Sequence, residues 1–136
     1  MLYSDIVWEN YKNPNNYGKL KGADLVFEDA NPKCGDTVKW HLKIEGGKIK
    51  DIRFEGSGCA LSTAGCSIVS EHFKGMALKK IAAMKDEEAW DILGFKPYVG
   101  RILCSTLGFS SLRKVAAEAA SEPRVTKRKT TKKKER

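Results

Sequence analysis

Three of the four cysteines lie where the chain is expected to pass from one secondary structure element to the next. Cys34, Cys59 and Cys104 each stand beside a glycine or a loop, where the backbone can turn a thiolate outward toward a ligand. Asp36 adds a carboxylate two residues after Cys34, and Gly35 between them can adopt the backbone angles that let both side chains converge on one atom. Three sulfurs and one oxygen form a four-coordinate set, so we interpret these four residues as candidate metal ligands.

Two kinds of metal centre fit this ligand set. Zinc is bound by four such ligands, and iron-sulfur clusters are usually held by cysteine thiolates, so composition alone does not choose between them. A carboxylate is a harder ligand than a thiolate and binds iron-sulfide centres less firmly, which favours release over permanent storage. The spacing matches no CxxC ribbon, finger or ferredoxin pattern, so the argument depends on the context of each cysteine.

The N-terminal residues, the longest uncharged run and the distribution of charge exclude several classes of protein. Residues 1–5 show no secretory signal, and the longest uncharged run, residues 56–70, is shorter than the roughly 18 apolar residues of a membrane span. We therefore expect a cytoplasmic protein that is not membrane-bound, in which disulfides are not the default use of cysteine. Residues 121–136 carry +6 of the net charge of +8, so the remainder is nearly neutral.

Length and composition predict one small domain with a tail. We expect residues 1–120 to fold and residues 121–136 to form a basic disordered tail, because Val125 is the only apolar residue after position 123. We interpret the tail as solvated. An alternative function from a different class is a zinc-stabilised module whose tail binds nucleic acid through counterion release.

The hydrophobic pattern predicts one helix followed by three strands. Ser4 and Asp5 are expected to cap a short helix that the turn at residues 13–16 ends. Strands are expected at residues 23–29, 37–44 and 49–55, with a hairpin turn at Gly46-Gly47. In the middle strand, strict alternation directs four apolar side chains to one face: Val38, Trp40, Leu42 and Ile44.

After Cys59 the period becomes helical. Helices are expected over residues 61–73 and 78–84, and a third is expected to be capped by Asp86. Cys104 directly follows a loop at residues 94–100 and opens a C-terminal helix of about fifteen residues. Strands first and helices afterward predict the α+β class, with a small antiparallel three-stranded sheet packed against helices.

Other chemically capable residues have simpler interpretations. Cys66 lies two helical turns and about 10 Å from Cys59, so we interpret it as a small buried residue. His41 and His72 are interpreted as solvated surface histidines. The tryptophans fit apolar positions and are interpreted as core or partner-facing residues: Trp8, Trp40 and Trp90.

Several motifs resemble one family over about residues 3–120, the IscU/SufU/NifU N-terminal iron-sulfur cluster assembly scaffolds. Two of these motifs are specific, an NPxNxG turn and an NPxCGD loop, and three shorter segments accompany them. In order along the chain they are Asn13-Pro14-Asn15-Asn16-Tyr17-Gly18, Asn31-Pro32-Lys33-Cys34-Gly35-Asp36, Phe54-Glu55-Gly56-Ser57-Gly58-Cys59-Ala60, Lys74-Gly75 and Cys104-Ser105.

The resemblance implies a SufE/NifU-like fold and one exposed site made by Cys34, Asp36, Cys59 and Cys104. It implies that the site holds a transient [2Fe-2S] cluster, or a zinc ion, and passes the cluster to apo iron-sulfur proteins. A cysteine desulfurase would be the partner that delivers sulfur, with Cys104 as the acceptor, and a homodimer is left open. Such a protein is a scaffold and sulfur acceptor and not an enzyme; the alternative is a SufU-type zinc-dependent sulfurtransferase.

The chain departs from the family's two branches at the last cysteine. Members of the IscU type have a histidine immediately before it and an LPPVK segment that a chaperone reads, whereas this chain has Leu103 and no such segment. Arg101, three residues before Cys104, resembles the SufU branch, but the insertion typical of that branch is absent. The resemblance therefore leaves the branch open.

Overall fold

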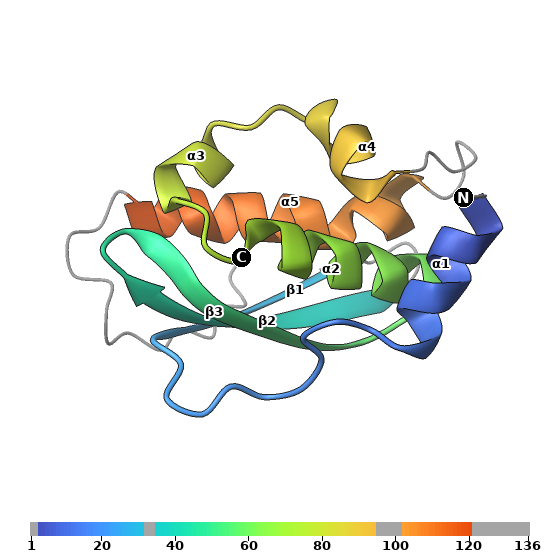
Figure 1. The fold of residues 1–136 in the computed structure, drawn as a ribbon, viewed down its shortest axis with the longest axis horizontal. Helices are drawn as coiled ribbons and strands as arrows, with labels where there is room; N and C mark the ends of the chain where they lie inside the picture. The colour runs from blue at the N-terminus through green and yellow to red at the C-terminus, as the bar shows by residue number, and fades with distance from the viewer. Residues whose placement is uncertain (1–2, 32–34, 95–101, 121–136) are drawn as a thin grey trace.

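The computed structural model describes residues 3–31, 35–94 and 102–120. Three antiparallel strands form a sheet in the order β1-β2-β3, with helices packed on one face (Figure 1). The elements in chain order are α1 (Tyr3–Lys12), β1 (Leu25–Asn31), β2 (Asp36–Glu45), β3 (Lys48–Ser57), α2 (Ala60–Phe73), α3 (Leu78–Ala82), α4 (Glu88–Leu93) and α5 (Ile102–Ala120). The predicted α+β class is confirmed.

The sheet follows from the alternation of β2. Its predicted inward side chains are all buried, and Trp40 lies opposite Phe27 of β1 and Phe54 of β3. Gly46 and Gly47 join β2 to β3 with φ of 62° and 77°, the left-handed pair that a two-residue hairpin turn requires. The hairpin sets the register that brings the end of β3 back beside the start of β2.

Helices α2 and α5 pack against each other at very short range. A Cβ atom on Gly65 of α2 would lie 2.4 Å from the carbonyl oxygen of Ser105, and one on Gly108 of α5 would lie 2.9 Å from Sγ of Cys66. Both glycines are buried, and neither has room for a side chain. Gly65 contacts Ser105, and the next residue of α2, Cys66, contacts Gly108 further along α5. The two helices therefore run in the same direction (Figure 1).

A buried hydrogen bond ties α5 to the sheet. The indole Nε1–H of Trp40, which is 0% exposed, donates to Oγ of Ser111 at 2.8 Å. Ser111→Ala should lower the free energy of unfolding by about 1 to 3 kcal/mol, because it leaves a buried donor without its acceptor. Urea denaturation measures the loss, with Ser110→Ala as the control; equal stability of the two variants would contradict the role of this bond.

Two details of the sequence prediction are wrong. His41 is only 7% exposed, because it lies between Val26 and Arg53 across the strands and its Nε2 lies 2.9 Å from Oε1 of Glu55. The side chain of Asp86 does not cap α4; it pairs with Arg113 of α5. His72 is exposed, as predicted.

The helix boundaries also differ from the prediction. Helix α1 begins at Tyr3, so Ser4 and Asp5 lie in its first turn and do not precede it. Helix α3 ends at Ala82, two residues before the predicted end, because the chain tightens there: the backbone N–H of Met84 bonds to the carbonyl of Ile81, three residues back, as in a 3₁₀ turn.

Two predicted segments fall outside the described residues, most of the loop at 94–100 and the tail at 121–136. Within the described ranges, we find no helix with the length and apolar character that crossing a membrane requires.

Candidate functional site

The structure describes the four predicted ligand residues to different extents. Asp36 and Cys59 are described in full, the backbone of Cys104 lies in the first turn of α5, and Cys34 lies outside the described residues together with the side chain of Cys104. Residues 3–31, 35–94 and 102–120 contain no group of three metal-ligating side chains. The described part of the site is therefore the pair formed by Asp36 and Cys59.

Asp36 is a buried carboxylate with one oxygen in use. It is the first residue of β2, lies opposite Asn31 of β1 and is 2% exposed. Its Oδ1 accepts a hydrogen bond from the backbone N–H of Cys59 at 3.2 Å. Its Oδ2 is buried and has no hydrogen-bond partner among the described residues. A buried carboxylate oxygen without a partner is costly, so this atom fits a bound cation.

Cys59 stands at the N-cap of α2. Its extended backbone (φ −79°, ψ 173°) ends the segment that leaves β3, and the carbonyl of Cys59 accepts the first helical bond, from the N–H of Thr63 at 3.1 Å. The side chain is half-buried and makes no capping bond to the helix, which leaves the sulfur available.

The close packing of α2 and α5 brings the backbone of Cys104 to the same end of the molecule. Ser105, the next residue, touches Gly65 in the second turn of α2. The N-termini of the two helices point the same way, since the helices run in the same direction (Figure 1). Cys104 does not follow a loop directly as the sequence suggested, because α5 begins at Ile102, two residues earlier.

Cys66 is a buried thiol and not part of the exposed site. It is 2% exposed and faces Gly108 of α5, which confirms the prediction of a small buried residue. Burial raises the pKa of its thiol far above the usual range, and the negative charge of Asp36 raises it further. The thiol of Cys66 is therefore neutral at physiological pH.

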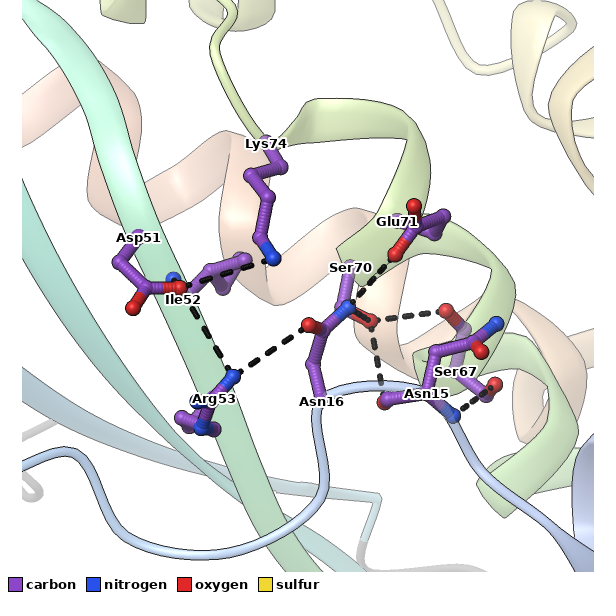
Figure 2. Close-up of polar contacts among 9 residues, drawn as sticks. All are labelled: Asn15, Asn16, Asp51, Ile52, Arg53, Ser67, Ser70, Glu71 and Lys74. Atoms are coloured by element: carbon purple, nitrogen blue, oxygen red, sulfur yellow. Dashed lines mark hydrogen bonds and ion pairs between the residues drawn. The ribbon is translucent and has the colours of Figure 1, made fainter.

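A network of polar side chains holds the NPxNxG turn against α2 and β3 (Figure 2). Asn16, at φ 59°, donates from Nδ2 to Oγ of Ser70 at 2.9 Å and to Oε1 of Glu71 at 3.1 Å, while its Oδ1 accepts from Arg53 at 3.4 Å. The backbone N–H of Asn15 donates to Oγ of Ser67 at 2.8 Å. These bonds fix α2 on β3, the two elements that flank Cys59.

Sequence reasoning assigned this turn to a motif but missed its function in the fold. Each bond spans more than thirty residues of sequence, so no local pattern shows the partners. The available signal was the run of asparagines, since an asparagine tolerates a positive φ and offers both donors and an acceptor. The neighbouring motif residue Lys74 lies 3.7 Å from a carboxylate oxygen of Asp51.

The fold and the site together define a class of protein: a small α+β domain that presents a thiol and a buried carboxylate at the N-terminus of a central helix. Comparison with known proteins gives the family. Residues 2–124 match the NifU-like N terminal domain, and the chain belongs to that family.

Its relatives carry two kinds of name. The chain is 32% identical over 117 residues to the iron-sulfur cluster assembly scaffold protein IscU 1 of Archaeoglobus fulgidus, covering 86% of this chain and 76% of the relative. It is 32% identical to the scaffold protein IscU of Escherichia coli, covering 90% of this chain and 97% of the relative. It is 31% identical to the zinc-dependent sulfurtransferase SufU of Bacillus subtilis, covering 86% of this chain and 90% of the relative.

Solved structures support the fold. A crystal structure of the N-terminal NifU-like protein of Brucella abortus superposes with a TM-score of 0.74, at 22% identity, covering 88% of this chain and 95% of that one. The SufU protein of Fervidobacterium islandicum superposes with a TM-score of 0.67, at 28% identity, covering 82% of this chain and 94% of that one. The predicted NifU-like architecture is confirmed.

Proposed function

We propose that this protein is an iron-sulfur cluster assembly scaffold, which accepts sulfur from a cysteine desulfurase and passes a transient [2Fe-2S] cluster to apo iron-sulfur proteins. The observation that carries the proposal is Oδ2 of Asp36, a buried carboxylate oxygen that has no hydrogen-bond partner among the described residues and lies beside Cys59 at a helix N-terminus. Family membership and relatives named as scaffolds support it. The chain acts in the cytoplasm as a scaffold and not as an enzyme.

The ligand set is Cys34, Asp36, Cys59 and Cys104. Asp36 offers Oδ2, because its Oδ1 already accepts the N–H of Cys59. Cys59 offers a sulfur that makes no capping bond to α2. Bound iron would be the cargo that these ligands hold, and a bound zinc ion would keep the thiolates ionised.

Sulfur enters by transfer between two cysteines. The thiolate of Cys104 attacks the outer sulfur of a persulfide on the desulfurase, a new S–S bond forms on Cys104, and the desulfurase cysteine leaves as a thiolate. The exchange is balanced and requires no external oxidant or reductant.

A zinc-dependent sulfurtransferase is the second candidate function. It is favoured by the similarity to SufU of Bacillus subtilis and by Leu103, which cannot ligate a metal where the IscU type has histidine. In that case the same four residues hold zinc and Cys104 takes the sulfur. Either function uses residues 1–120 as the working domain and leaves the basic residues 121–136 outside the site. Both functions are compatible with a monomer or a homodimer.

Metal and sulfide analysis of the anaerobically purified full chain distinguishes these functions. Iron together with acid-labile sulfide supports the scaffold, whereas stoichiometric zinc without sulfide supports the sulfurtransferase. Chelation separates both from a structural zinc module with a nucleic-acid-binding tail. A structural site unfolds when its metal is removed, but a scaffold site loses metal and keeps its fold.

Asp36→Asn should reduce metal affinity while preserving the fold. Asparagine keeps a carbonyl oxygen to accept the N–H of Cys59 but removes the charged Oδ2, and loss of this ligand should weaken Co²⁺ binding at least about tenfold. Asp36→Ala also removes the acceptor and should lower the free energy of unfolding by about 1 kcal/mol more. Asp91→Asn, on the exposed surface of α4, is the control. Co²⁺ affinity unchanged in Asp36→Asn would argue against this aspartate as a ligand.

A further inference from the structure

Gly58 is the residue against which the carboxylate of Asp36 packs. A Cβ atom at position 58 would lie 2.4 Å from Oδ1, 2.9 Å from Cγ and 3.1 Å from Cβ of Asp36. The backbone of Gly58 is not in the left-handed region, so backbone conformation does not require a glycine here. The requirement is space: the chain between β3 and α2 passes directly over the carboxylate.

We propose that Gly58 is a positioning residue that gives the two oxygens of Asp36 separate functions. Close passage of the Gly58 backbone lets Oδ1 reach the N–H of Cys59 at 3.2 Å, and this bond leaves Oδ2 as the single ligand atom. The carboxylate therefore binds a metal through one oxygen. This inference rests on the proposed function, since it assigns Oδ2 to the metal.

A methyl group at position 58 has two ways to be accommodated, and both disturb the site. Asp36 is 2% exposed, so its carboxylate can move only by displacing packed neighbours. The alternative is a shift of the segment from Gly58 to Cys59, which breaks the hydrogen bond to Oδ1 and moves the sulfur of Cys59. In each case Oδ2 of Asp36 and the sulfur of Cys59 lose their relative position, although neither residue has been replaced.

A double-mutant cycle on the full-length chain tests this coupling. Metal-free unmodified protein, Gly58→Ala, Asp36→Ala and the double variant are titrated with Co²⁺ under anaerobic conditions, with absorbance from thiolate ligation as the readout. Gly58→Ala should weaken Co²⁺ binding about 10- to 100-fold, the range for groups that orient metal ligands. In the Asp36→Ala background the same change should cause little further loss, because the oxygen it displaces is gone. Ser57→Ala, one residue earlier and exposed, is the control.

Thermal unfolding of the same metal-free proteins gives an independent readout. Gly58→Ala should lower the melting temperature when Asp36 is present and lower it less in the Asp36→Ala background, where the contacts with Oδ1 and Cγ no longer exist. Unchanged Co²⁺ affinity in Gly58→Ala, or equal loss in both backgrounds, overturns the role of Gly58. An unmodified chain that does not bind Co²⁺ contradicts the proposed function instead, and the melting temperatures still decide whether Gly58 and Asp36 are coupled.

Discussion

Cys104→Ser is expected to abolish persulfide formation by a cysteine desulfurase, whereas Cys66→Ala leaves it near the level of the unmodified chain. The backbone of Cys104 lies in the first turn of α5, and in the proposed function Cys104 is the residue that takes sulfur from the desulfurase. Cys66 is buried and its thiol pKa is raised, so it offers neither access nor a nucleophilic sulfur. Mass spectrometry after brief exposure to desulfurase and cysteine locates the added sulfur.

Cys59 is the most informative competitor in this experiment. It also stands at a helix N-terminus, but its backbone N–H is bonded to Asp36 and its segment follows directly from β3. This restraint limits how far its sulfur can reach into the active site of a partner. Persulfide recovered chiefly on Cys59 or Cys34 would refute the assignment to Cys104 while leaving the metal site in place.

The sheet could be predicted because its determinants are local. Strict alternation in β2 and the glycine pair at residues 46 and 47 fix strands, faces and turn without reference to distant residues. The errors arose where distant contacts override a local signal. Asp86 has the chemistry of a helix cap but pairs with Arg113, twenty-seven residues away, and His41 occupies a polar-face position that its cross-strand neighbours cover.

The structure describes two of the four predicted ligand residues in full, Asp36 and Cys59, and their geometry could not be predicted from the sequence. The sequence prediction paired Asp36 with Cys34 through Gly35 and grouped both with Cys59 as candidate ligands, and in the structure Oδ1 of Asp36 lies 3.2 Å from the backbone nitrogen of Cys59. Nothing in the sequence separates Oδ1 from Oδ2 of Asp36 or shows that Gly58 passes over the carboxylate. Both depend on how the start of β2 and the end of β3 pack, which only the register of the sheet determines.

Cys66 provides the last prediction, a loss of stability at alkaline pH. Its thiol pKa in the folded chain is raised far above the value of about 8.5 for an unfolded chain, first by burial and then by Asp36. Above that pH the unfolded chain releases the thiol proton and the folded chain keeps it. The contribution of this thiol to stability is therefore complete below about pH 8 and falls as the pH rises, by about 1.4 kcal/mol for each unit above 8.5.

Urea denaturation of the unmodified chain and Cys66→Ala at pH 7.5 and pH 10 measures this effect. Between these pH values the unmodified chain should lose about 2 kcal/mol more than Cys66→Ala, because a thiol that titrates only after unfolding is absent from the variant. The other cysteines, the tyrosines and the lysines titrate in both proteins, so their contributions cancel in the difference. The same pH dependence in both proteins would contradict this prediction. It would mean that Cys66 ionises in the folded chain despite its packing against Gly108 of α5.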